Sequence, residues 1–184
     1  MRKLATLFTD SYQEFRHVRT ITTLAMFAAI SVVLGYFTID AGPYVKIGFS
    51  TISNQFVHYM FGPVVGAFFG GALDILKYLL KPTGPYFPGF TFSAALAGLI
   101  YGFFLYKKPL SVKRILLAEL IVSVLCNMLL GTYWLNLLYG KAFMAIFPMR
   151  VLKNLIMTPI NAALFYSIGK AMEAAGIFRM LKGK

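Results

Sequence analysis

Acidic residues, histidines and cysteines are all scarce in this sequence. Its 184 residues include 6 Asp and Glu, 2 His and 1 Cys. The single Cys126 cannot form an internal disulfide and has no neighbours that would complete a metal site, so we expect no bound metal and no cofactor. His17 and His58 lie far apart in the sequence, and no nucleophile stands beside a base. These shortages argue against an enzyme.

Charge of either sign is also low. Charged residues make up 13% of the sequence, whereas hydrophobic residues make up 59%, and a soluble domain carries about 25% charged residues. The phosphate-binding loop G-x-x-x-x-G-K-[ST] does not occur, so we do not expect the chain to hydrolyse ATP. The composition is typical of an integral membrane protein, and we place it in the bilayer.

Uncharged or nearly uncharged runs of about bilayer length follow one another along the chain. They predict transmembrane helices at 20–37, 47–61, 63–80, 86–106, 115–138 and 146–168. Gly62-Pro63 separates the second helix from the third, because proline and glycine interrupt helical hydrogen bonding. The predicted fold class is therefore an all-α integral membrane protein, with a six-transmembrane-helix bundle at residues 19–175.

Residues 1–18 form a separate predicted element. Apolar residues recur there at helical spacing with basic residues around them, which indicates an amphipathic interfacial helix in the headgroup plane. With six spans, both termini lie on one side, together with twelve of the 18 Lys and Arg: Arg2, Lys3, Arg16, Arg19, Lys107, Lys108, Lys113, Arg114, Lys170, Arg179, Lys182 and Lys184. The positive-inside rule makes that side, including a basic tail at 176–184, cytoplasmic. We expect the net charge of +12 to face anionic lipid and not nucleic acid.

The other six cations fall in the outer half of the predicted bundle. They are Lys46, Lys77, Lys81, Lys141, Arg150 and Lys153. Arg150, Lys153 and Asn154 share one helix face, and cations are rare at such depths unless they are paired or functional. This face predicts a site for an anionic ligand. The alternative is that the two cations extend to the outer headgroups.

Two acidic residues lie within predicted spans. Asp74 offers two parallel acceptors to a planar ligand that carries an amino group beside a ring N–H, or it pairs with Lys77 one helical turn away. We interpret Glu119 as a surface partner of Lys113 and Arg114, because these cations precede it near the cytoplasmic start of its helix.

Aromatic and amide residues gather at the outer end of the fifth predicted helix. Trp134 is the only tryptophan, with Tyr133 before it and Asn136 two positions after it. Aromatic faces beside amide groups suit a flat heteroaromatic ligand, although aromatic residues at this depth also form interfacial belts.

Four stretches resemble the folate-specific S components of energy-coupling factor (ECF) transporters. They are GALDIL at 71–76, KPTGPYFPGFTFSAAL at 81–96, TYWLNLLYGKAF at 132–143 and PMRVLKNLIMTPI at 148–160. The resemblance implies that Asp74 binds the pterin, Trp134 and Tyr133 stack on it, Arg150 or Lys153 meets the glutamate, and Thr91, Asn136 and Asn154 add hydrogen bonds. The loops at 39–46 and 81–88 carry Gly and Pro residues that suit hinges, so we expect these loops to act as lids over the ligand.

The same resemblance implies a subunit that captures folate outside a prokaryotic cell membrane and works with a membrane coupling protein and two ATPases. Ala25 and Ala29 match the family's Ala-x-x-x-Ala coupling motif, although small residues at this spacing also serve ordinary internal packing. An S component for another vitamin and a small ion-coupled secondary transporter are the alternatives.

Overall fold

Helices make up almost all of the computed structural model, which describes residues 2–37, 39–40, 46–82, 84–140 and 143–182. The helices are α1 (Arg2–Glu14), α2 (Val18–Tyr36), α3 (Ser50–Leu80), α4 (Pro88–Leu105), α5 (Val112–Val122), the π-helix η1 (Ser123–Leu130), α6 (Gly131–Tyr139), α7 (Phe143–Ala174) and α8 (Ile177–Lys182). Two short strands, β1 (Ile39–Asp40) and β2 (Lys46–Ile47), pair antiparallel. The prediction of an all-helical membrane protein is confirmed at this level.

Five stretches of the described chain are long and apolar enough to cross a membrane. They are Val18–Tyr36, Ser50–Leu80, Pro88–Leu105, Val112–Leu138 and Arg150–Ala174. All five correspond to predicted spans, and α3 contains two of the predicted spans, 47–61 and 63–80, in one run. α4 begins with Pro88 in its first turn, where the absent N–H costs no helical hydrogen bond.

α3 doubles back on itself at Gly62. This residue has φ 88° and ψ −169°, a conformation that favours glycine, and Pro63 starts the second half of the helix. The Ser31 hydroxyl of α2 donates to the carbonyl of Ser50 at 3.3 Å, and the Tyr36 hydroxyl donates to the carbonyl of Leu80 at 3.4 Å. Both ends of α3 therefore lie near one end of α2, whereas a straight helix of this length would separate them by about 45 Å. The predicted break at Gly62-Pro63 is confirmed.

Ser11 of α1 binds the backbone groups that this break exposes. Its hydroxyl donates to the carbonyl of Phe61 at 2.7 Å and accepts from the N–H groups of Val64 and Val65 at 3.0 and 3.2 Å. The Ser11 side chain is fully buried. One hydroxyl thus serves both the last turn of the first half of α3 and the first turn of the second half.

Replacing Ser11 with alanine should destabilise the protein by about 1–3 kcal/mol, because the buried N–H and carbonyl groups at the break lose their partner. The measurement is the apparent unfolding temperature of the full chain in detergent. Ser167→Ala, at an exposed position of α7, is the matched control. Equal unfolding temperatures for the two variants would contradict this role for Ser11.

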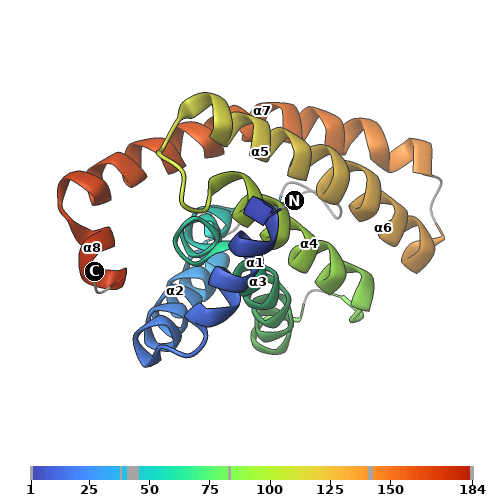
Figure 1. Ribbon diagram of the computed structural model, residues 1–184. Coiled ribbons are helices and arrows are strands. Elements are labelled where there is room, and N and C mark those ends of the chain that lie inside the picture. Colours follow the sequence, from blue (N-terminus) through green and yellow to red (C-terminus); the bar gives the residue numbers. More distant parts are fainter. Residues whose placement is uncertain (1, 38, 41–45, 83, 141–142, 183–184) are drawn as a thin grey trace.

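The helices form two layers. In Figure 1, α5, η1, α6 and α7 lie together along one side of the molecule, and α1, α2 and α3 lie on the other with α4 between them. The second half of α3 packs closely on α4 through glycines, since a side chain at Gly98 would overlap the backbone of Gly66 and one at Gly70 would overlap Ala94. Small residues allow such close approach in membranes, where lipid is as apolar as the helices.

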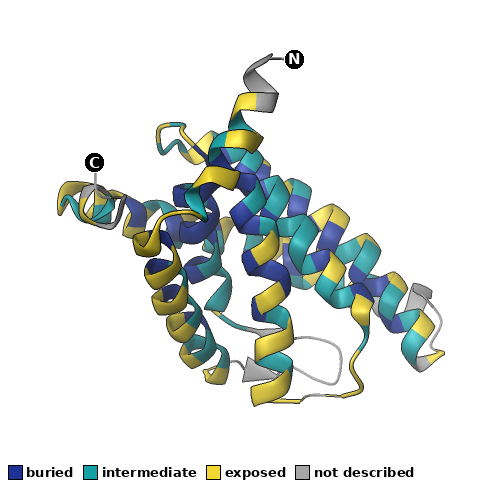
Figure 2. Cartoon of the chain, turned by 60° about the horizontal axis from the view of Figure 1, so that its bottom comes forward, coloured by how far each residue is buried: buried dark blue, intermediate teal, exposed yellow. Residues whose placement is uncertain are grey.

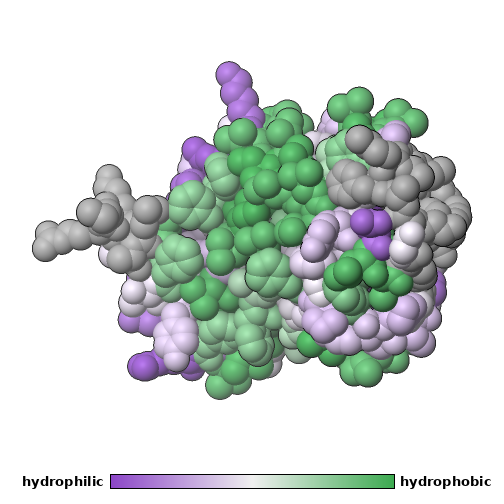
Figure 3. All heavy atoms as spheres, turned by 90° about the vertical axis from the view of Figure 1, so that its right-hand side faces the viewer, coloured by the Kyte–Doolittle hydropathy of each residue, from purple (hydrophilic) through white to green (hydrophobic). Residues whose placement is uncertain are grey.

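We refer to the two ends of the bundle as the Gly62 end and the Trp134 end. α4 runs from the Trp134 end, where Ser93 contacts Trp134, to the Gly62 end, where Gly102 lies against Pro63. α5, η1 and α6 run in the opposite direction. Buried residues line the inner faces of the helices and exposed residues cover the outer faces (Figure 2). Apolar side chains cover a broad area of the face in Figure 3, as expected of a surface in contact with lipid.

The prediction for Glu119 is wrong. Its side chain is 4% exposed, accepts a hydrogen bond from the Tyr101 hydroxyl at 2.7 Å, and accepts another from the amide of Gln55. Arg114 instead donates to the carbonyl of Pro109 at 3.0 Å. The sequence showed only the cations that precede Glu119 on its own helix, whereas its actual partners lie on α3 and α4.

Candidate binding site

Asp74 lies on the last turns of α3 beside the first turn of α4. Its carboxylate accepts a hydrogen bond from the Thr91 hydroxyl at 2.8 Å, and that hydroxyl is 3.0 Å from the hydroxyl of Tyr86. Among the described residues, Lys77 forms no close ion pair with Asp74, although the two charges lie near enough to interact. Asp74 is half-buried, and a carboxylate with one occupied acceptor can accept further hydrogen bonds.

Trp134 lies on the other side of the α4 N-terminus. Its indole N–H donates to the Ser93 hydroxyl at 2.9 Å, and its ring contacts those of Phe87 and Tyr133 at centroid distances of 5.6 and 5.0 Å. Thr91 and Ser93 are two positions apart on α4 and face different directions. Asp74 and Trp134 therefore flank the first turn of α4, where Tyr86 contacts Thr91, the partner of Asp74, and Phe87 contacts Trp134.

Gly89 allows the approach of Trp134 to the start of α4. A Cβ atom at this position would lie 2.6 Å from Cδ2 of Trp134 and 2.5 Å from Cε1 of Phe87. Real Cβ atoms do not come so close to ring carbons, so any larger residue would displace one of the two rings. The indole is thus fixed by a hydrogen bond on one edge and by close packing on another.

Arg150 on α7 contacts the π-helix η1. Its guanidinium donates to the carbonyl of Asn127 at 2.8 Å and occupies the space beside Gly131, where a side chain would overlap it. A change from π- to α-helical hydrogen bonding leaves a carbonyl without its usual helical partner, and Arg150 binds a carbonyl just before that change. The guanidinium of Arg150 lies against Gly131, and Trp134 is one turn further along α6. Arg150 of α7 therefore lies along the face of α6 that carries Trp134.

The remaining predicted residues occupy the same end of the bundle. Tyr133 is 51% exposed. Asn136 on α6 and Lys153 on α7 are half-buried, and Asn154 is buried. Within the described part of the chain, none of the side chains of Asn136, Lys153 and Asn154 forms a hydrogen bond or ion pair. Most of the predicted lid at 39–46 lies outside the described residues.

Ala25 and Ala29 lie far from this cluster, on α2. Both are exposed, so the structure does not place them in the internal packing that we considered as the alternative.

A family model described as "ECF transporter, substrate-specific component" matches residues 19–169. The chain belongs to this family. It is 38% identical over 158 residues to "Folate transporter FolT" of Clostridium novyi, covering 86% of this chain and 92% of that protein. It is 30% identical over 154 residues to "Folate transporter FolT" of Leuconostoc mesenteroides, covering 80% of this chain and 83% of that protein.

A solved structure of FolT bound with folic acid is similar to this chain over almost the whole length of the FolT chain. The TM-score is 0.78 at 35% sequence identity, and the match covers 84% of this chain and 95% of that one. Members of this family are the substrate-binding components of transporters and not enzymes.

Sequence reasoning missed three residues of the cluster: Tyr86, Phe87 and Ser93. All three lie within the stretch at 81–96 that carried the resemblance, but nothing in their spacing indicated contact with Trp134 or Thr91. Their roles depend on how α4 sits between α3 and α6, which a linear pattern does not contain.

Proposed function

We propose that this chain is the folate-binding S component of an ECF-type importer in a prokaryotic cell membrane. The observation that carries the proposal is the α4 N-terminus, where Asp74 bonds Thr91 on one side and Trp134 bonds Ser93 on the other. An anionic acceptor and a fixed indole suit a pterin, and the similarity to FolT bound with folic acid supports the same ligand class.

Each part of folate has a proposed partner. Asp74 accepts hydrogen bonds from the amino group and ring N–H of the pterin, and Trp134 stacks on the ring together with Tyr133. Arg150 or Lys153 binds the glutamate carboxylates, for which the half-buried guanidinium is a suitable donor. Neutral hydrogen bonds come from Thr91, Asn136 and Asn154.

The loops at 39–46 and 81–88 are proposed to close over the ligand. In the second loop, the Tyr86 hydroxyl lies 3.0 Å from that of Thr91, and the Phe87 ring packs against Trp134. Movement of this loop would therefore change the surroundings of residues on both sides of the α4 N-terminus.

The proposed membrane topology has six spans: α2, the two halves of α3, α4, the run from α5 to α6, and α7. The reversal of α3 at Gly62 supports the count, because both of its ends lie near the end of α2. Both termini are then cytoplasmic, with α1 at the headgroups and residues 176–184 as a basic tail. This orientation puts the Trp134 end outside.

The proposed partners are a membrane coupling protein and two ATPases. Ala25 and Ala29 are one turn apart on the outward face of α2, and both are exposed. Two small residues at this spacing leave a shallow groove in which the backbone of a partner helix can approach.

The full chain, purified in detergent, should retain folate, and thiamine or riboflavin should not displace it.

In liposomes, uptake should require ATP together with the coupling protein and both ATPases. The double variant Ala25→Leu/Ala29→Leu should keep folate affinity and lose ATP-driven uptake, because the bulky side chains fill the proposed groove. Uptake driven by an ion gradient without the ATPases would overturn the proposal.

A further inference from the structure

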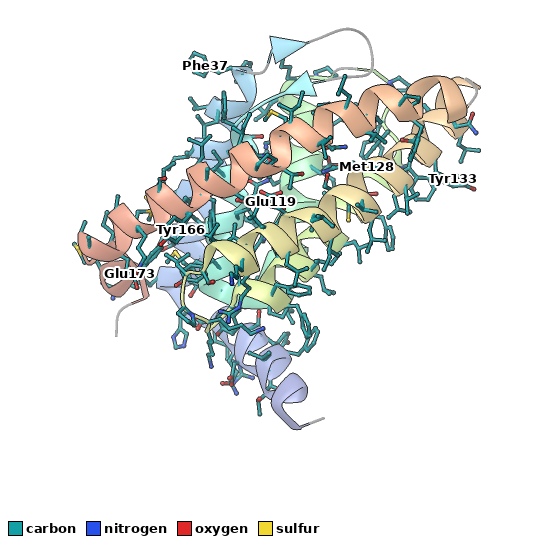
Figure 4. The ribbon with its side chains drawn as sticks, turned by 90° about the horizontal axis from the view of Figure 1, so that it is seen from above. Phe37, Glu119, Met128, Tyr133, Tyr166 and Glu173 are labelled. Carbon is teal, nitrogen blue, oxygen red and sulfur yellow. The ribbon has the colours of Figure 1, made fainter. Side chains whose placement is uncertain are left out.

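Glu119 belongs to a second polar cluster, separate from the candidate binding site. Its carboxyl group contacts Gln55 of α3 and Tyr101 of α4, and these three side chains are 4%, 1% and 4% exposed, respectively. In Figure 4, Glu119 lies near the middle of the bundle, whereas Tyr133 lies towards one end and Glu173 at the other. Nothing in the proposed folate site uses this residue.

No cation neutralises Glu119 within the described part of the chain. The two ion pairs there join Lys107 to Asp10 and Lys170 to Glu173. The two hydrogen bonds from Gln55 and Tyr101 offset only part of the cost of a carboxylate without a cation in an apolar interior, and such a group favours its protonated form. In a membrane bundle, lipid surrounds the core and adds to this effect.

The groups that face the cluster bring no compensating charge. His58 of α3 stacks on Tyr101 with a centroid distance of 5.8 Å, and its Nδ1 atom is buried without a partner in the described structure. Ser123 and Cys126 lie one and two turns beyond Glu119 and are buried. α7 contributes apolar side chains to this core: Ala162 and Phe165.

A carboxamide is a suitable partner for a carboxyl group in either protonation state. Its NH₂ group donates to a carboxylate, and its carbonyl accepts from a carboxylic acid. The Oε1 atom of Gln55 is buried with no partner among the described residues, and rotation of the amide exchanges the places of its oxygen and nitrogen. Gln55 can therefore hold Glu119 with or without its proton.

The cluster also joins the two layers of the fold. Glu119 lies on α5 in one layer, Gln55 lies on α3 in the other, and Tyr101 lies on α4 between them. At the Trp134 end, the hydrogen bond from Trp134 to Ser93 makes a comparable link. A change at Glu119 therefore acts on the contact between the layers.

We propose that Glu119 is a proton-binding site: in the folded bundle its carboxyl group is neutral and joins α5 to α3 and α4 through Gln55 and Tyr101. On ionisation the proton passes to bulk water, an anion remains in the apolar core, and the contact between the layers weakens. This inference does not depend on the identity of the transported substrate.

The first test is the pH dependence of unfolding for the full chain in detergent. If folding takes up a proton at Glu119, the unfolding equilibrium constant rises by up to tenfold for each pH unit above about 4.3, the ordinary value for glutamate, until the folded chain itself ionises. Glu119→Gln should lose this contribution and show a flatter dependence. Glu173→Gln, which removes an exposed acid of the same type, should keep the wild-type slope.

The second test detects the proton directly by infrared spectroscopy. A carboxylic acid C=O band should be present at neutral pH in the Asp74→Asn chain, which lacks the other acid near the bundle interior, and adding Glu119→Gln should remove it. Measuring Asp74→Asn alone keeps the test decisive if the double variant does not fold. Absence of the band, or equal pH slopes for wild type and Glu119→Gln, would overturn the proposal.

Discussion

Asp74→Ala is expected to weaken folate binding by about 2–4 kcal/mol, roughly 30- to 1000-fold, because the pterin loses its charged acceptor. The folate affinity of Asp74→Asn should fall between those of the wild type and Asp74→Ala. The amide keeps one acceptor but offers the pterin donors an unfavourable NH₂ group. Isothermal titration calorimetry of the purified full chain measures both variants.

The matched control for Asp74 is Thr91→Val. This change removes the hydroxyl that donates to Asp74 at 2.8 Å and keeps the shape of the side chain. It should lower the affinity much less than Asp74→Ala does, because the carboxylate remains. Unchanged folate affinity in Asp74→Ala would show that the pterin binds elsewhere, whatever the function of the chain.

Arg150→Met should weaken folate binding by about 2–3 kcal/mol, roughly 30- to 150-fold, because the glutamate carboxylates lose a charged donor. The affinity for a pterin that lacks the glutamate should stay the same. Asp74→Ala, by contrast, should weaken the binding of both ligands. Titrating each variant with each ligand therefore assigns the two ends of folate to the two sides of the site.

Arg150 also donates to the carbonyl of Asn127, so Arg150→Met removes a contact between α7 and η1. Arg150→Lys keeps the positive charge but loses the planar pair of donors, so it should lose less folate affinity than Arg150→Met does. An equal loss for folate and for the shortened pterin in Arg150→Met would argue that Arg150 supports the structure and does not bind the carboxylates.

Much of the backbone could be predicted from the sequence. The helices follow apolar runs of bilayer length. The reversal of α3 follows from Gly62-Pro63, since glycine adopts positive φ easily and proline lacks an N–H. The π-helix η1 could not be predicted, because Ser123–Leu130 contains neither proline nor glycine.

The candidate site was predicted in part. Asp74 and Trp134 were identified from their residue types and from the resemblance, and the structure gives each a hydrogen-bond partner on α4. Ser93, the partner of Trp134, was not identified. A serine near the start of an apolar helix is common in membrane proteins, and only the position of α6 gives it a role.

By itself, the sequence determined the membrane environment, the approximate extent of the helices and the chain reversal at Gly62, because these depend on local composition and backbone chemistry. Tertiary structure decided which side of each helix faces inward. A helix that is apolar all round carries little signal for its own rotation, so the partners of Glu119, 64 and 18 residues away on α3 and α4, emerged only once the helices were packed.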